Sequence, residues 1–141
     1  MTRSSFRATG IAALAVAVLV AGCGPNPRAL DNRQWSDNFA FRITIDPSPP
    51  RSVEEATYKI VVQDKKTGEP IETGEGRIFA TSKDGANTDD GLAKAKEVGT
   101  YTGRLFFPTS GDWAVGLQFR RESTQRLERV DWVQTVNDSP Q

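Results

Sequence analysis

The chain has 141 residues, enough for one domain, and carries 18 basic and 18 acidic residues. It has no histidine, one methionine at the initiator position and one cysteine, so soft and borderline metals such as copper lack their usual ligands. The sequence lacks the concentrated basic stretch that is typical of nucleic-acid-binding proteins.

Residues 1–22 have the pattern of an export signal. Arg3 and Arg7 give a positively charged start, residues 11–20 (IAALAVAVLV) are continuously apolar, and small residues precede Cys23. The apolar run is too short to span a bilayer comfortably, which takes about 20 residues. Removal of this segment leaves 16 basic and 18 acidic residues.

The sequence LVAGC at 19–23 resembles the lipobox of bacterial lipoproteins. The resemblance implies cleavage before Cys23 and acylation of this residue, and an anchor of more than one acyl chain would be lasting. The alternative is an ordinary secretory signal that leaves Cys23 as a free thiol. Gly24 stands where an aspartate would favour retention at the inner membrane. The absence of that aspartate favours the outer membrane. The expected location is the cell membrane or outer membrane, with the lipid-anchored protein facing the periplasm or the exterior.

The rest of the chain is divided into a lipidated tether at 23–37, a β-domain at 38–137 and a tail at 138–141. Residues 24–38 are rich in proline, asparagine and aspartate, without a period. Apolar residues then alternate with polar ones from Phe39 to Ile45 and from Ala56 to Val62, as in half-buried strands. A third strand is predicted at 71–81, where Gly74 and Gly76 indicate a bulge or a close approach.

Residues 82–98 (SKDGANTDDGLAKAKEV) form the most polar connection, and a helical turn is predicted around LAKAKE. Asp84, Asn87, Asp89 and Asp90 supply the oxygen ligands that calcium prefers. Their spacing fails the EF-hand pattern, because aligning either loop glycine puts an alanine at the first ligand position. The alternatives are a ligand loop and a solvated turn; no metal is expected.

The stretch GTYTGRLFFPTSGDWAVGLQF at 99–119 predicts a central hairpin. Its apolar residues occupy odd positions on both sides of a three-residue loop, Thr109-Ser110-Gly111, with glycine in the left-handed region. The predicted cross-strand pairs are Phe107 with Trp113, Leu105 with Val115, Gly103 with Leu117 and Tyr101 with Phe119.

A last strand is predicted after the turn ESTQR, with Val130, Trp132, Gln134 and Val136 on one side. Arginines gather around this turn with acidic residues between them, which indicates a solvated, salt-bridged edge. The whole pattern predicts an all-β, immunoglobulin-like antiparallel β-sandwich of about seven strands.

The pattern G-x-Y-x-G, an apolar run and a Gly-Asp-Trp strand start resembles the YtkA-like domain, and GEPI at 68–71 matches its turn. The likeness rests on Gly99, Tyr101, Gly103, Gly111, Trp113 and Val115. Such domains occur in bacterial membrane-attached proteins, including FixH-related accessory proteins. Related CopC-like sandwiches bind copper through histidine and methionine, which this chain lacks.

The chain is therefore expected to be a non-catalytic interaction module without a cofactor, anchored to the membrane by lipid and accessory to an envelope protein complex. Without histidine, a serine or cysteine nucleophile has no imidazole base. A carboxylate pair or a Ser–Lys arrangement stays open, although neither shows diagnostic spacing. The alternative function is binding of a small ligand or hard cation by residues 82–98.

Overall fold

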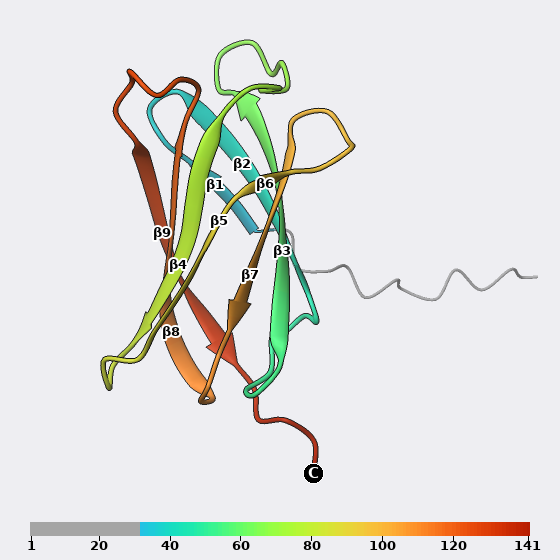
Figure 1. Ribbon diagram of the computed structural model, residues 1–141, viewed down its shortest axis with the longest axis vertical. Coiled ribbons are helices and arrows are strands. Elements are labelled where there is room, and N and C mark those ends of the chain that lie inside the picture. The colour runs from blue at the N-terminus through green and yellow to red at the C-terminus, as the bar shows by residue number, and fades with distance from the viewer. Residues whose placement is uncertain (1–31) are drawn as a thin grey trace, which may run out of the picture.

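The computed structural model describes residues 32–141, which form two antiparallel sheets packed face to face (Figure 1). One sheet has the strand order β1-β2-β3-β7-β6 and the other β5-β4-β8-β9. The strands are β1 Asn32–Trp35, β2 Phe39–Asp46, β3 Glu55–Asp64, β4 Glu75–Ser82, β5 Asn87–Gly91, β6 Ala93–Lys94, β7 Thr100–Phe106, β8 Gly111–Arg120 and β9 Glu128–Val136.

The all-β sandwich prediction is confirmed, with nine strands instead of about seven. The additional strands are short and polar. β1 (NRQW) lies in the part of the chain assigned to the tether, yet it pairs with β2 along its whole length, so residues 32–35 belong to the sheet. The signal segment and Cys23 lie outside the described residues.

The core forms where the alternating apolar residues of both sheets meet. Phe119 of β8 packs edge-on against Phe39 and Tyr101 of the other sheet, with ring centroids 5.1 and 5.2 Å apart. Tyr101 is held by its hydroxyl, which donates to the backbone oxygen of Ile71 at 2.8 Å. Trp113 is fully buried and its indole nitrogen donates to the oxygen of Thr109 at 3.0 Å. These residues satisfy their polar atoms while filling the space between the sheets.

The predicted central hairpin is wrong, because β7 and β8 belong to different sheets. β7 pairs with β3 and β6, whereas β8 pairs with β4 and β9. The 107–110 connection therefore crosses between the sheets, and Gly111 has the expected positive φ, at 112°. Phe107 still contacts Trp113, with centroids 5.2 Å apart, but across the sandwich instead of along a ladder. The alternation of apolar and polar residues predicted the buried face of each strand correctly, but it does not indicate which strand lies next to it.

Gly76 and Gly103 are among the glycines at which neighbouring segments come too close for a side chain. A Cβ at Gly76 would lie 2.1 Å from the Gln118 carbonyl oxygen, which confirms the predicted close approach in the third strand. A Cβ at Gly103 would lie 2.8 Å from Ile78 on the opposite sheet. Gly103 thus makes room for the facing sheet, and its strand partner is Tyr58 of β3 instead of the predicted Leu117.

Residues 82–98 are not a loop with a helical turn, so that prediction is also wrong. They contain β5, which pairs with β4, and β6, which pairs with β7. The chain therefore passes from one sheet to the other between Gly91 and Ala93 and closes that side of the sandwich (Figure 1). No helix that could span a bilayer occurs among the described residues.

Candidate functional site

The four predicted ligand residues are dispersed by β5. Successive strand residues point to opposite faces, so Asp89 and Asp90 face different ways. Asp89 forms an ion pair with Arg77 at 3.7 Å, and Asn87 accepts a hydrogen bond from the Thr81 hydroxyl at 2.8 Å. Asp84 lies in the exposed turn between β4 and β5.

Asp90 protects a strand edge. Its carboxylate accepts a hydrogen bond from the backbone N–H of Arg104 on β7 at 2.8 Å, and the Thr88 hydroxyl accepts one from the N–H of Phe106 at 3.2 Å. These side chains of β5 satisfy the N–H groups of β7 beyond the end of the short strand β6. An exposed strand edge is a template for pairing with another chain, and here it is blocked.

Within residues 32–141, no group of three or more histidine, cysteine, aspartate or glutamate side chains is arranged to hold a metal ion. Asp89 and Asp90 do line a shallow depression of about 470 Å³, together with Glu55 and Arg104. Arg104 also lies 3.5 Å from the Glu55 carboxylate, so charges in this depression are already paired.

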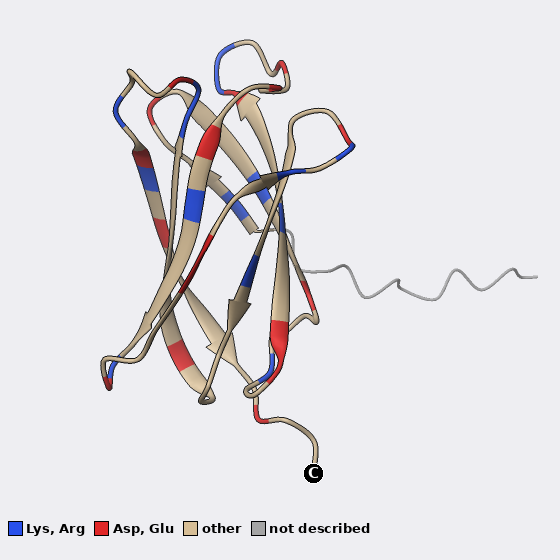
Figure 2. Ribbon diagram, viewed as in Figure 1, with Lys and Arg blue, Asp and Glu red and all other residues tan. Residues whose placement is uncertain are grey.

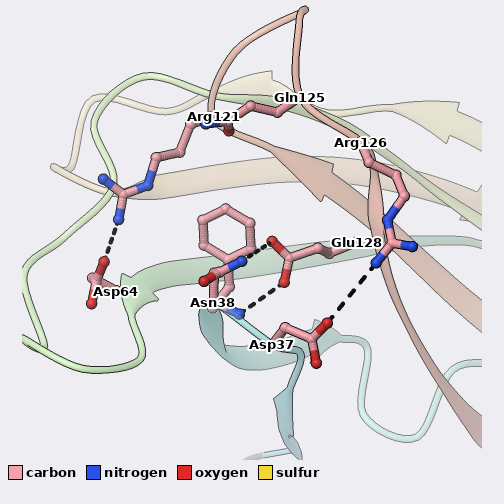
Figure 3. Close-up of a pocket in the computed structure, with 8 residues that line it drawn as sticks. Asp37, Asn38, Asp64, Arg121, Gln125, Arg126 and Glu128 are labelled. Carbon is pink, nitrogen blue, oxygen red and sulfur yellow. Dashed lines mark hydrogen bonds and ion pairs between the residues drawn. The ribbon is translucent and has the colours of Figure 1, made fainter.

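A larger gathering of charged side chains lies at one end of the sandwich, which we call the charged end. The β1–β2, β3–β4 and β8–β9 connections meet there around a depression of about 530 Å³ (Figure 3). Loops at the end of a rigid sandwich are common positions for binding sites. The lining residues are Asp37, Asn38, Phe39, Asp64, Arg121, Gln125, Arg126 and Glu128.

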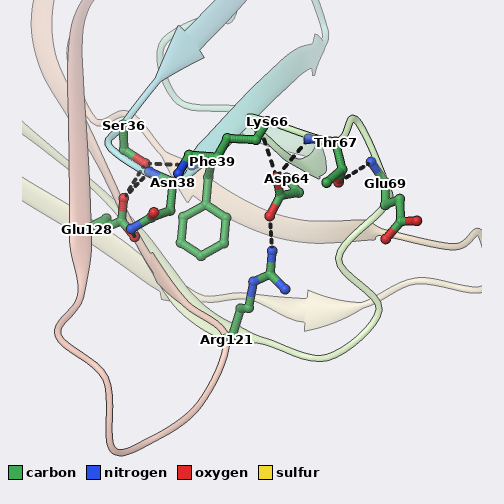
Figure 4. Close-up of polar contacts among 9 residues, drawn as sticks. All are labelled: Ser36, Asn38, Phe39, Asp64, Lys66, Thr67, Glu69, Arg121 and Glu128. Atoms are coloured by element: carbon green, nitrogen blue, oxygen red, sulfur yellow. Dashed lines mark hydrogen bonds and ion pairs between the residues drawn. The ribbon is translucent and has the colours of Figure 1, made fainter.

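Glu128, the first residue of β9, fastens the β1–β2 connection to the other sheet (Figure 4). One carboxylate oxygen accepts hydrogen bonds from the Ser36 hydroxyl and the Asn38 backbone N–H, both at 2.8 Å. The other oxygen accepts one from the Asn38 side-chain amide at 3.1 Å. Partial burial acts to raise the pKa of Glu128, but the bonds from Asn38 and Ser36, together with the Arg126 charge, lower it overall.

Asp64, the last residue of β3, organises the β3–β4 turn in a similar way. Its carboxylate accepts the backbone N–H groups of Thr67 at 3.0 Å and Lys66 at 2.8 Å (Figure 4). These two bonds, with Arg121 beside the carboxylate, lower the pKa of Asp64. Arg121 pairs with Asp64 and extends over the Phe39 ring, with 5.9 Å between the guanidinium carbon and the ring centre.

The predicted salt bridges around the β8–β9 turn are present, but most of the partners come from elsewhere in the chain. Sequence spacing indicated the cluster of arginines, whereas their partners depend on which strand ends meet in space. The pairs are Arg120 with Glu75, Arg121 with Asp64, Arg126 with Asp37 and Arg129 with Asp131.

At the charged end, two carboxylates stay ionised and are held in place by hydrogen bonds. Glu128 and Asp64 are ionised well below neutral pH, and the hydrogen bonds described above occupy their oxygens. A carboxylate in this state is a poor general base at neutral pH, because catalysis is best when the pKa lies near the working pH. These two carboxylates are therefore poorly suited to proton transfer at neutral pH.

The second candidate site is the outer edge of β9. β9 has nine residues and ends its sheet, whereas the other terminal strands have four (β1), two (β6) and five (β5) residues. Its two ends are fastened by Glu128 and by Asn137, which exchanges backbone hydrogen bonds with Ser52 and Pro50 at 2.8 and 2.9 Å. Between these ends β9 has β8 as its one strand neighbour among the described residues.

These features define a small all-β sandwich module. Its β5–β6 side is closed, and the longest unpaired strand edge among the described residues, that of β9, lies on the opposite side. The chain belongs to the YtkA-like family, whose model matches residues 33–118. It is also similar in fold to the crystal structure of a DUF4426 family protein from Pseudomonas aeruginosa PAO1, with a TM-score of 0.55 and 14% sequence identity over 78% of this chain and 100% of that one. Comparison with curated proteins gave no match.

Proposed function

We propose that this protein is a lipid-anchored, extracytoplasmic interaction module that acts without catalysis as an accessory to an envelope or membrane complex. The observation that supports this most directly is the outer edge of β9. Evolution usually shortens, blocks or covers such edges. In this chain Asp90 and Thr88 block the edge of β7, while the longest terminal strand has no such cover among the described residues.

An extended segment of a partner protein could add to this edge as a further strand. Backbone hydrogen bonds would then provide affinity, and alternate side chains would provide specificity. The exposed side chains along β9 include Arg129, Asp131 and Val133, the last 69% exposed. Because both ends of β9 are fastened to the other sheet, the accessible edge suits a short segment.

Photocrosslinking in native membranes tests this proposal. A photoreactive residue at Val133 should capture a discrete protein partner. The matched control is Phe106, which is 48% exposed and lies in β7 of the other sheet. Equal capture at both positions, or none at Val133, would contradict a partner on the β9 edge.

The lipid anchor is tested separately through Cys23. The Cys23→Ser substitution should release the mature protein from membranes after a high-salt wash, because it removes the predicted acylation site. Membrane association that survives both the substitution and the wash would contradict lipid anchoring.

The alternative function, binding of a small ligand or hard cation by residues 82–98, has less support from the geometry. Asn87, Asp89 and Asp90 all bond to other parts of the protein, and β5 holds Asp89 and Asp90 on different faces.

A further inference from the structure

The hydrogen-bond pattern of the four-stranded sheet shows which backbone groups of β9 are free. Just after β5, the Leu92 N–H donates to the Gly76 carbonyl oxygen at 2.9 Å, so Gly76 directs its backbone groups toward β5. Along a strand these groups point alternately to either side. Followed through the register of β4, β8 and β9, this alternation directs the even-numbered residues of β9 toward β8. The odd-numbered residues, among them Asp131, Val133 and Thr135, direct their N–H and carbonyl groups to the free edge.

The β2–β3 connection occupies one end of this edge and agrees with that direction. Asn137, the odd-numbered residue after β9, donates its N–H to the Pro50 carbonyl oxygen at 2.9 Å and accepts from the Ser52 N–H at 2.8 Å. At the other end, the β1–β2 connection is fastened to Glu128. The stretch between them, residues 129–135, is about 23 Å long at about 3.3 Å per residue, so it has room for an added segment of about seven residues.

The charged and hydroxyl side chains of β9 bond within the sheet instead of shielding its free edge. The Arg129 guanidinium donates to both oxygens of Asp131 at 2.9 and 3.0 Å, and it lies 4.8 Å from the centre of the Phe79 ring on β4. The Thr135 hydroxyl donates to the Asp112 carboxylate of β8 at 2.8 Å. Figure 2 shows that the charged positions of β9 lie in its first half, whereas the second half has none. The edge therefore lacks the unpaired charges that commonly protect such strands.

Apolar side chains flank the middle of the free edge on both faces. On the outer face Val133 is 69% exposed and lies beside Ala114 of β8. On the inner face Trp132 is half-buried and packs against the core. Gln134, also half-buried, donates its amide to the Thr135 carbonyl oxygen at 3.0 Å, a bond that an added strand would replace. Residues that pair across strands share a face, so an added segment would place side chains beside Val133 and Trp132.

From this geometry we infer that the β9 edge binds an extended protein segment of about seven residues, uncharged and apolar on both faces, through the backbone of Asp131, Val133 and Thr135. This inference rests on the proposed function, whose partner it describes chemically. Charged side chains are selected against because Arg129 and Asp131 satisfy each other, so a further charge would be desolvated without a partner. Proline is excluded at alternate positions, since every second N–H of the segment must bond to β9.

Amide hydrogen exchange tests the register without a ligand. The protein used is the chain from residue 23 onward with Cys23→Ser, which contains all of the described fold. The N–H groups of Asp131 and Val133 should exchange at least about tenfold faster than those of Trp132 and Gln134, which bond to β8. Equal rates, or the reverse order, would overturn the assignment of the free groups.

A displayed library of random heptapeptides tests the ligand chemistry with the same protein. Selected peptides should be uncharged, with apolar residues on both faces and no proline at alternate positions. Val133→Pro removes an edge N–H but no bond to β8, so the variant should fold and lose at least about tenfold in affinity for a selected peptide. Val133→Ala should weaken binding at least about fourfold, the effect of one buried CH₂ group. The matched control is Val98→Ala in the β6–β7 connection, where the side chain is 56% exposed, and it should leave binding unchanged.

N-methylated peptides give a second measurement that does not depend on the folding of Val133→Pro. Methyl groups on every second backbone nitrogen of a selected peptide should abolish binding, and methyl groups on the intervening nitrogens should leave it unchanged. No selected peptide, a charged consensus, or binding that neither set of methyl groups affects would overturn the inference. A dimer of the protein that Val133→Pro dissociates would also overturn it, because a second copy would then occupy the edge.

These results are distinguishable from failure of the proposed function. A crosslink at Val133 in native membranes without any selected peptide would refute the segment chemistry while the proposed function stands. Selected peptides without a crosslink at Val133 would support the segment chemistry and refute the proposed envelope partner.

Discussion

Replacement of Glu128 by glutamine gives the sharpest test of how the charged end is held together. The wild-type carboxylate accepts three hydrogen bonds, two from Asn38 and one from Ser36. Hydrogen bonds to charged groups contribute about 1.5–3 kcal/mol each when well shielded. Because the site is largely open to solvent, screening reduces the whole set to about 1–2 kcal/mol. A glutamine amide would also place a donor against one of the existing donors.

The Glu128→Gln variant should therefore lose about 1–2 kcal/mol of unfolding free energy at neutral pH in a urea titration, and roughly 4 °C in Tm for each kcal/mol. Glu122→Gln is the matched control, since Glu122 is an exposed carboxylate in the same β8–β9 turn. Glu122→Gln should leave the unfolding free energy unchanged.

The contribution of Glu128 to the unfolding free energy should change with pH in a definite direction. The pKa of Glu128 is lower in the folded state than in the unfolded chain, so in acid the unfolded chain binds more protons. The stabilisation from Glu128 is complete above the unfolded pKa, near 4.3, and is lost as pH falls through the lower folded pKa. The difference between wild type and Glu128→Gln should shrink in acid. Equal stability at neutral pH and parallel pH profiles would refute the role of this carboxylate.

Three further predictions concern the fold. Trp113→Ala should cost about 3–5 kcal/mol in a denaturant titration, because the ring is fully buried, and a near-zero loss would contradict its core position. Gly116→Val should cost about 1–3 kcal/mol in the same assay, since a Cβ there would lie 2.3 Å from the Phe79 ring; unchanged stability would mean that the ring moves freely. Asp90→Ala should accelerate amide hydrogen exchange at Arg104, whose N–H would lose its acceptor, and unchanged exchange would contradict edge blocking.

Sequence periodicity determined which residues are buried more reliably than which strands are neighbours. Tyr101, Phe107, Trp113 and Phe119 are all core residues, as their odd-numbered spacing predicted. The hairpin failed because a short turn can return the chain to its own sheet or carry it to the facing one. Alternation is the same in both cases.

The short polar strands were missed for a related reason. β5 reads NTDDG and β1 reads NRQW, so neither has the apolar alternation that identifies a strand with one buried face. Both are terminal strands that depend on backbone pairing with a stronger neighbour. Their polar side chains therefore appeared as a ligand loop and a tether.

The candidate surfaces could be predicted only in part. The arginines around the β8–β9 turn were visible as a cluster, but Glu128 and Asn38 are 90 positions apart and meet only because two sheets close at one end. Trp35, Lys65 and Leu127 likewise line one depression, although they come from β1, the β3–β4 connection and the β8–β9 connection. Contacts between residues so far apart in the sequence depend on the order of the strands in the sheets, which short-range sequence patterns do not reveal.

The short first strand has a mechanical consequence. If the protein is anchored at Cys23, any tension between membrane and domain enters the sheet at Asn32. Among described residues, β1 has β2 as its one strand neighbour, through four residue pairs, whereas β2 and β3 share eight. Under tension, β1 would separate from β2 first, and each residue released would lengthen the connection between Cys23 and the sheet by about 3.3 Å. The apolar interior would remain intact, so β1 would detach and extend before the tension reached the core of the sandwich.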